Sequence, residues 1–167
     1  GSRHVAWADA TTRGEAVRAE NRALPVALAR DGATWAFAGG APIAQRSAPR
    51  RSHAEIDACG ACHARRSVIT DPYEYGRPLR DRHRPALLEA GLYTDDGQIQ
   101  DEVYEWGSFL QSRMHAAGVT CSDCHDPHSG ALRAEGNGVC AQCHQPAVFD
   151  VPAHHRHAAG SDAARCV

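Results

Sequence analysis

Cysteine pairs followed directly by histidine are the residues of this sequence whose types and spacing are best suited to chemistry. They occur three times, as Cys59-Gly60-Ala61-Cys62-His63, Cys121-Ser122-Asp123-Cys124-His125 and Cys140-Ala141-Gln142-Cys143-His144. Two residues between the cysteines place both thiols on one turn of chain, and the next residue presents an imidazole. This C-x-x-C-H pattern is the attachment signature of c-type haem, in which the thiols form thioethers to the porphyrin and the histidine binds the iron. The sequence therefore predicts a multihaem cytochrome c with three complete sites.

Two other kinds of site use cysteine pairs. Fifteen residues lie between Cys124 and Cys140, which is also the spacing of a four-cysteine zinc site. A zinc site does not require a histidine after each pair, and it would leave Cys59 and Cys62 unexplained. Disulfides are the third interpretation, but C-x-x-C pairs are more often redox or metal sites than structural cross-links.

Bulky aliphatic side chains are scarce. Leu, Ile, Val and Phe together make up 25 of the 167 residues, about 15%, below the roughly 20% that a chain usually needs to bury a core of its own. Porphyrins are large, flat and apolar, so we expect the haems to form the core. The predicted fold class is mainly α with extensive loop, with a small β-hairpin near the N-terminus.

Each haem iron needs a second axial ligand, and histidine is the abundant donor. Of the eleven histidines, eight lie outside the three motifs, whereas there is one methionine, Met114, and no lysine. Because methionine raises the potential relative to histidine, mainly bis-histidine haems of low potential are expected. The candidates for the distal position are His115, His128, His83, and one of His154 and His157.

The elements that must position these residues fall into two predicted parts. Residues 1–50 lack cysteine, and we expect them to cover a haem with a hairpin of residues 25–28 and 34–37, with a further strand within 42–46. Residues 51–167 form the expected multihaem domain.

Helices are expected over residues 12–24, over residues 52–66, with Ser52 as N-cap and Arg65 and Arg66 in the last turn, and over residues 101–117, where Gly118 ends the helix. Asn137 is expected to cap the helix that carries Cys140.

Charge and hydropathy limit the partners. The net charge is −2, and all 18 basic residues are arginine, so nothing indicates a nucleic-acid partner. Arginine suits bidentate pairing with haem propionates. No transmembrane segment and no signal peptide are recognised. Since covalent haem attachment is normally completed outside the cytoplasm, a periplasmic or extracellular location is expected, with the export signal outside these residues.

Residues 102–114 and 118–128 resemble multihaem cytochromes c that often carry tetratricopeptide repeats, and the resemblance extends to residues 59–70 and 154–157. These proteins are related to the nitrite reductases and hydroxylamine oxidoreductases. The resemblance implies that His115, shortly before a motif, binds a different haem. It also implies that Gly1-Ser2-Arg3-His4 follows an earlier haem motif, and that Cys166 begins a fourth haem site.

The sequence thus predicts electron transfer between closely spaced haems and redox proteins, including other haem subunits. The alternative is a haem oxidoreductase that reduces a small nitrogen or sulfur compound at one open iron. The absence of lysine departs from the lysine-ligated catalytic haem of nitrite reductases. A zinc-binding scaffold is the third alternative.

Overall fold

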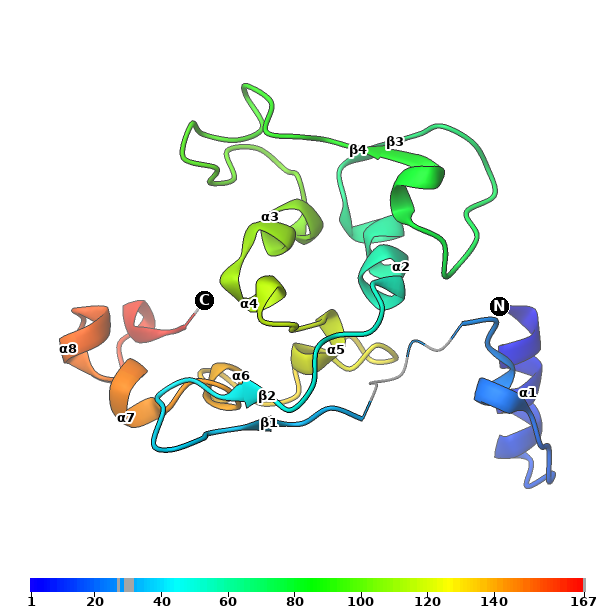
Figure 1. The fold of residues 1–167 in the computed structure, drawn as a ribbon, viewed down its shortest axis with the longest axis horizontal. Helices are drawn as coiled ribbons and strands as arrows, with labels where there is room; N and C mark the ends of the chain where they lie inside the picture. The colour runs from blue at the N-terminus through cyan, green and yellow to red at the C-terminus, as the bar shows by residue number, and fades with distance from the viewer. Residues whose placement is uncertain (27, 29–31, 167) are drawn as a thin grey trace. The chain divides into compact units, whose positions relative to one another are not determined.

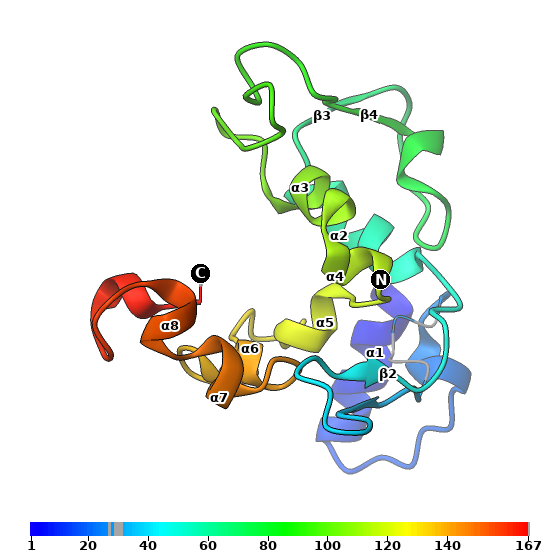
Figure 2. The same cartoon turned by 60° about the vertical axis from the view of Figure 1, so that its left-hand side comes forward.

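The computed structural model describes residues 1–26, 28 and 32–166. Contacts divide the chain into two compact units, Gly1–Ala29 with Ser52–Ser108, and Arg30–Arg51 with Phe109–Val167. Many short helices, long loops and two small two-stranded sheets make up the fold (Figures 1 and 2). The predicted division at residue 50 stays a prediction.

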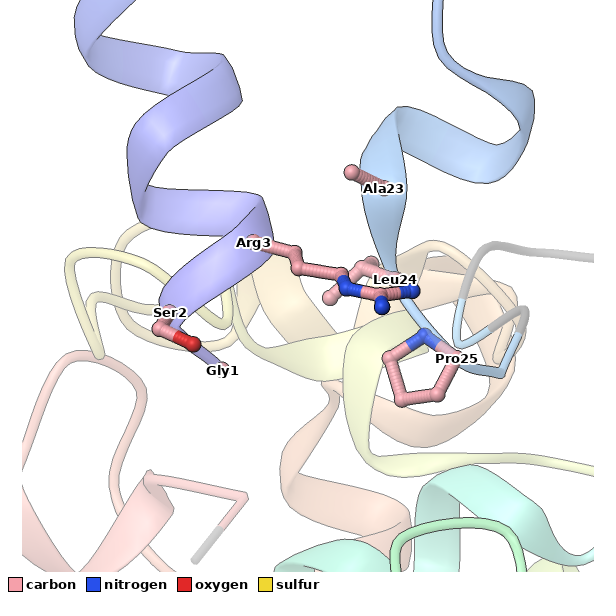
Figure 3. Close-up of a pocket in the computed structure, with 6 residues that line it drawn as sticks. All are labelled: Gly1, Ser2, Arg3, Ala23, Leu24 and Pro25. Atoms are coloured by element: carbon pink, nitrogen blue, oxygen red, sulfur yellow. The ribbon is translucent and has the colours of Figure 1, made fainter.

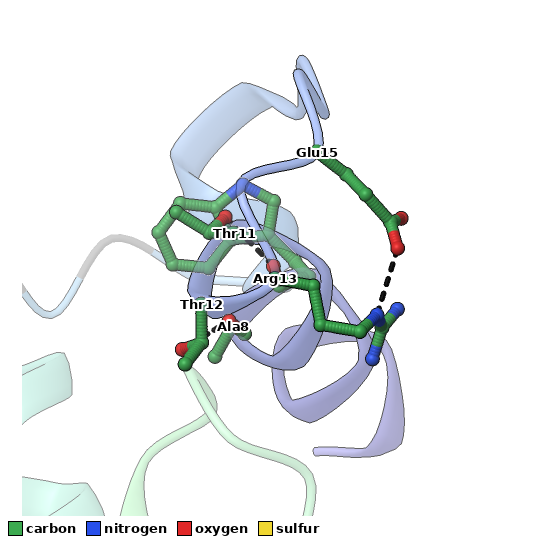
Figure 4. A network of polar contacts seen from close by, with 6 residues as sticks. Ala8, Thr11, Thr12, Arg13 and Glu15 are labelled. Atoms are coloured by element: carbon green, nitrogen blue, oxygen red, sulfur yellow. Dashed lines mark hydrogen bonds and ion pairs between the residues drawn. The ribbon is translucent and has the colours of Figure 1, made fainter.

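The first unit begins with α1, Ser2–Thr12, and the 3-10 turn η1, Glu20–Ala23. The helix expected over residues 12–24 is wrong, because α1 ends where that range begins. Thr11 and Thr12 donate to the carbonyls of Trp7 and Ala8 at 2.8 and 3.0 Å, and the exposed pair Arg13–Glu15 follows at 2.7 Å (Figure 4). Threonine hydroxyls that bond back to the preceding turn favour a helix end.

The rest of the first unit contains α2 (Ala54–His63), β3 (Arg66–Val68), η2 (Leu79–Asp81) and β4 (His83–Pro85). A helix within the expected range 52–66 is confirmed over Ala54–His63, with His53 rather than Ser52 as N-cap, although Ser52 Oγ accepts from the Ala54 N–H at 3.0 Å. The expected last turn at Arg65 and Arg66 is wrong, because α2 ends at His63 and Arg66 begins β3.

The antiparallel pairing of β3 with β4, which brings Val68 opposite His83, was not predicted. The strands are only three residues long, and the arginine-rich run around His83 carries no strand alternation.

The helix expected over residues 101–117 is two helices, α3 (Glu105–Gln111) and α4 (Arg113–Ala116). Ser112 interrupts the helix, because its hydroxyl accepts from the His115 N–H at 3.0 Å and caps α4. Gly118 has a φ of +99° beyond the end of α4, which confirms its predicted place.

The second unit carries the sheet of β1 (Trp35–Ala36) and β2 (Gln45–Arg46), with Trp35 opposite Arg46. A hairpin near the N-terminus is therefore present, but Trp35–Ala36 pair with Gln45–Arg46, inside the expected further strand, rather than with the described residues of 25–28. Residue 27, in the other expected strand, lies outside the described residues. The remaining elements are α5 (Cys121–Cys124), α6 (Gly138–Ala141), α7 (Pro146–Phe149), α8 (Pro152–His155) and η3 (Asp162–Ala164).

In the described part of the chain, no helix is both long enough and apolar enough to cross a bilayer.

Candidate haem-binding site

In each of the three motifs a helical turn carries the first cysteine. Cys59, Cys62 and His63 all lie within α2, whereas α5 spans Cys121–Cys124 and His125 follows it in extended conformation. The third motif begins in α6, with Cys140 inside the helix and His144 beyond its end. Side chains three residues apart on a helical turn point to the same side. The thiols of a pair are therefore placed to attach to one flat group.

The first motif packs against apolar side chains of its own unit. A Cβ added at Gly60 would lie 2.5 Å from Trp106 Cδ1 and Nε1 and 2.9 Å from Leu79 Cδ2. Arg66 donates to the Ala61 carbonyl. These contacts fix α2, and they require glycine at the first position between the cysteines.

Two titratable groups lie beside the first motif. Burial raises the pKa of Asp57 and outweighs the opposing hydrogen bond from the Leu79 backbone. Burial, with the negative charge of Asp57 next, raises the pKa of Tyr73 to about 12. Burial therefore disfavours the charged form of both groups, as expected in an environment of low polarity.

The second motif starts from a capping box. The Asp123 carboxylate accepts from the Thr120 N–H at 2.8 Å, and the Thr120 side chain faces the Asp123 backbone. His125 forms an isolated antiparallel bridge with Leu132, flanked by the bond from Arg133 N to Cys124 O at 2.9 Å.

The third motif has an equivalent bridge. His144 pairs antiparallel with Ile43, flanked by bonds from Ala44 N to Cys143 O at 2.7 Å and from Gln145 N to Pro42 O at 2.9 Å. These bonds join residues about a hundred positions apart in the chain, and they hold the backbone of His144 extended. The pairing of these histidines with Ile43 and Leu132 was not predicted, because no local sequence pattern indicates an isolated bridge.

Burial raises the pKa values of the Cys140 and Cys143 thiols. Nearby acidic groups add to the effect, chiefly Cys166 for Cys140 and Asp123 for Cys143. Cys124 contributes to both shifts, so the two motifs of the second unit lie near each other. Gln142 Nε2 also donates to the Asp123 carbonyl at 3.4 Å.

Asn137 stands before α6, as expected, but its side chain does not cap that helix. Its amide nitrogen donates to Asp150 Oδ1 and Ala164 O at 2.9 and 3.1 Å, and its oxygen accepts from Cys166 N at 2.9 Å. Cys140 Sγ donates to the Cys166 carbonyl at 3.3 Å. Asn137 thus holds the segment with Cys166 next to the third motif.

The alternative uses of cysteine find no support in the described residues. None of the seven cysteines, all of which are described, forms a disulfide. Within that same part of the chain, no three side chains of His, Cys, Asp or Glu converge as a metal cluster. A four-cysteine zinc site would require such a cluster.

The expected distal histidines differ in their surroundings. His83 is only 4% exposed, and its ring centroid lies 5.7 Å from that of Tyr73, in edge-on geometry. The His83 Nδ1 has no hydrogen-bond partner among the described residues. His115 is half-buried, whereas His128, His154 and His157 are exposed. Which histidine completes each haem stays a prediction.

Phe149 lies between two of the histidines. Its ring centroid is 4.9 Å from that of His144 and 5.2 Å from that of His154, in edge-on geometry. The structure therefore brings His154 into the neighbourhood of the third motif.

These residues fit a covalently bound haem. His63 and His125 expose their side chains, and the bridge partners Ile43 and Leu132 are 47% and 49% exposed. Directly opposed residues of an antiparallel pair share a face, so each bridge presents an imidazole beside a large exposed aliphatic group. Such a surface suits the edge or face of a porphyrin.

The family described as the doubled CXXCH motif matches residues 114–149. No curated protein and no solved structure shows a significant match to the chain. The chain therefore contains a c-type cytochrome haem-binding region, which includes the second and third motifs.

A pocket of about 370 Å³ lies elsewhere, between the start of α1 and the end of η1 (Figure 3). Its lining residues are Gly1, Ser2, Arg3, Ala23, Leu24 and Pro25. This lining has no thiol, imidazole or carboxylate.

Proposed function

We propose that the chain transfers electrons through three covalently bound haems c, attached at the motifs that end in His63, His125 and His144. The observation that carries this proposal is the placing of paired thiols on one turn of chain, directly before a histidine, in all three motifs. When bound, haem supplies one-electron redox chemistry, and the protein sets its potential through ligands, burial and hydrogen bonds. The arginine-rich composition favours binding of the propionates.

The proposed iron ligation is mainly bis-histidine, which gives low potentials and irons closed to substrates. The candidates for the second ligand are His83, His115, His128, His154 and His157. Cys166, held beside Cys140, is the proposed first residue of a fourth attachment site.

The resemblance of residues 102–128 supports a finer assignment. We place the chain among the multihaem cytochromes that often carry tetratricopeptide repeats, in the lineage of nitrite reductases and hydroxylamine oxidoreductases. Covalent attachment of haem implies an exported protein, in the periplasm or outside the cell, and redox proteins or other haem subunits as partners.

The test is production of the chain with the cytochrome c maturation machinery, followed by mass spectrometry and a reduced-minus-oxidised visible spectrum. We expect the added mass of three haems and the α-band of c-type haem, and Cys→Ser pairs in each motif should remove one haem each. Bare thiols in the matured protein would overturn the proposal.

Carbon monoxide then separates the electron carrier from an enzyme. Six-coordinate bis-histidine irons do not bind carbon monoxide readily, so the reduced spectrum should not change. A shift of the Soret band in about a third of the haem would favour the oxidoreductase with one open iron.

A further inference from the structure

The Arg50 side chain holds the segment that leads into the second motif. Its Nη1 donates to the carbonyl oxygens of His115 and Val119 at 3.2 and 3.0 Å, and its Nη2 lies 3.0 Å from His115 Nε2. One planar guanidinium thus contacts both ends of the five-residue segment 115–119, which lies 65 to 69 positions further along the chain.

The contact with Arg50 determines which imidazole nitrogen of His115 accepts a hydrogen bond. A guanidinium has donors and no acceptor, so His115 Nε2 must accept with its lone pair, and the neutral ring carries its proton on Nδ1. Coordination of iron through Nε2 would use the same lone pair. The Arg50 contact and iron binding through that nitrogen therefore exclude each other.

The surroundings of His115 are built for this arrangement. The Phe109 ring meets the imidazole edge-on at 5.6 Å, and Ser112 accepts from the His115 backbone N–H at 3.0 Å. On the other side, a Cβ at Gly118 would lie 3.0 Å from Arg46 Cδ and 3.8 Å from Arg50 Cβ. A side chain at Gly118 would crowd Arg46 and would touch Arg50 at an ordinary van der Waals distance.

The held segment ends at the start of α5. Val119 is buried, with 8% exposure, and Thr120 begins the capping box of the helix that carries Cys121 and Cys124. Because Thr120 directly follows Val119, a held Val119 carbonyl also fixes the orientation of the start of α5, which carries this motif.

We propose that Arg50 is a positioning residue for the second motif, and that His115 is the partner of Arg50 rather than an axial haem ligand. The part of this inference that concerns ligation rests on the proposed function. The holding of residues 115–119 by Arg50 does not depend on it.

The test uses the matured protein and the variants Arg50→Ala, Arg50→Lys, His115→Gln and Arg50→Ala/His115→Gln. In thermal unfolding, the double variant should lose about as much Tm as Arg50→Ala alone, because His115→Gln removes only the side-chain contact at Nε2, which Arg50→Ala already removes. Lysine should not rescue Arg50→Ala, because a single ammonium cannot reproduce the planar fork that bonds three acceptors. Additive losses of Tm, or full rescue by lysine, would overturn the role of Arg50.

Ligation is read separately by electron paramagnetic resonance, carbon monoxide binding and redox titration. In His115→Gln we expect every ferric haem to stay low-spin and no new carbon monoxide binding, while Arg50→Ala shifts the potential of one haem. A high-spin signal in His115→Gln that added imidazole removes would identify His115 as a ligand and overturn the inference. If the wild-type protein carries no haem, the proposed function fails, and the Tm cycle still decides the role of Arg50.

Discussion

Single residues between the paired cysteines differ among the motifs, and these differences decide what can pack there. The first position holds Gly60, Ser122 and Ala141 in turn. Only Gly60 lies under an indole, since Trp106 would be 2.5 Å from an added Cβ. The first motif therefore depends on a missing side chain in a way that the other two do not.

Replacing Gly60 with alanine should lower the free energy of unfolding by about 1–3 kcal/mol, because Trp106 and Leu79 must move. The gain in helix propensity, about 1 kcal/mol, offsets part of this loss. Thermal unfolding measures the change, and peptide mapping should find less haem on Cys59 and Cys62. The matched control is Gly138→Ala, where the nearest atom, Ala134 Cβ, is 3.3 Å away. Equal stability of both variants would contradict the prediction.

The ionisation of Asp57 should make the stability of the fold depend on pH. Burial raises its pKa above 3.8 in the folded chain, so its contribution to stability is present in acid and is lost as the pH rises through the folded pKa. Asp57→Asn should therefore be more stable than the wild type at pH 7, by no more than about 1 kcal/mol because solvent screens the group. The difference should vanish below about pH 4. Tm values measured from pH 3.5 to pH 7 check this, and a difference that grows in acid would contradict it.

At the scale of elements, the two bridges explain how short helices present their histidines. His125 pairs with Leu132, and His144 pairs with Ile43, each in extended backbone directly after a helical turn. The helices of the second and third motifs are only four residues long. Helices this short are unstable alone, so the bridges supply the support that the helices lack.

The exposed partners of these bridges should tune the haems. Ile43→Ser and Leu132→Ser each place a hydroxyl beside one proximal histidine, and greater polarity stabilises the ferric state. Each variant should lower the midpoint potential of one haem, on the order of tens of mV. Redox titration of the α-band measures the shift, and the exposed Val5, in α1, gives the control Val5→Ser. An unchanged titration curve in both variants would show that neither side chain meets a haem.

The same elements show what the sequence can predict. The C-x-x-C-H pattern is local, so spacing alone identifies the candidate attachment residues, and the helix that carries Cys59 was predicted from the cap signal at Ser52. The bridge of Ile43 with His144 depends on residues about a hundred positions apart, and strands of one to three residues leave no periodic signal. The interruption of the expected helix at Ser112 was not predicted, because apolar residues at helical spacing continue across this position. The Ser112 hydroxyl competes locally for backbone hydrogen bonds, and this competition ends α3.

For the molecule as a whole, the interior is small for the length of the chain. Among the described residues, Ile56 and Leu79 are the largest side chains that are fully buried. The aliphatic residues Ile69, Leu87 and Leu88 are at least 60% exposed. Burial of this kind supplies little of the free energy that must offset chain entropy. That the haems supply the missing core stays a prediction.

Hydrogen exchange tests this dependence in the second unit. The variant Cys121→Ala/Cys124→Ala/Cys140→Ala/Cys143→Ala cannot form thioethers at two motifs, and we expect amides of residues 114–149 to exchange as fast as those of an unfolded chain. Amides of α2 should remain protected, because the proposed attachment residues Cys59 and Cys62 are unchanged and Trp106 still covers Gly60. The control Cys166→Ser leaves all three complete motifs intact and should keep the wild-type protection pattern. Wild-type protection of residues 114–149 in the four-cysteine variant would show that side-chain packing alone stabilises this unit.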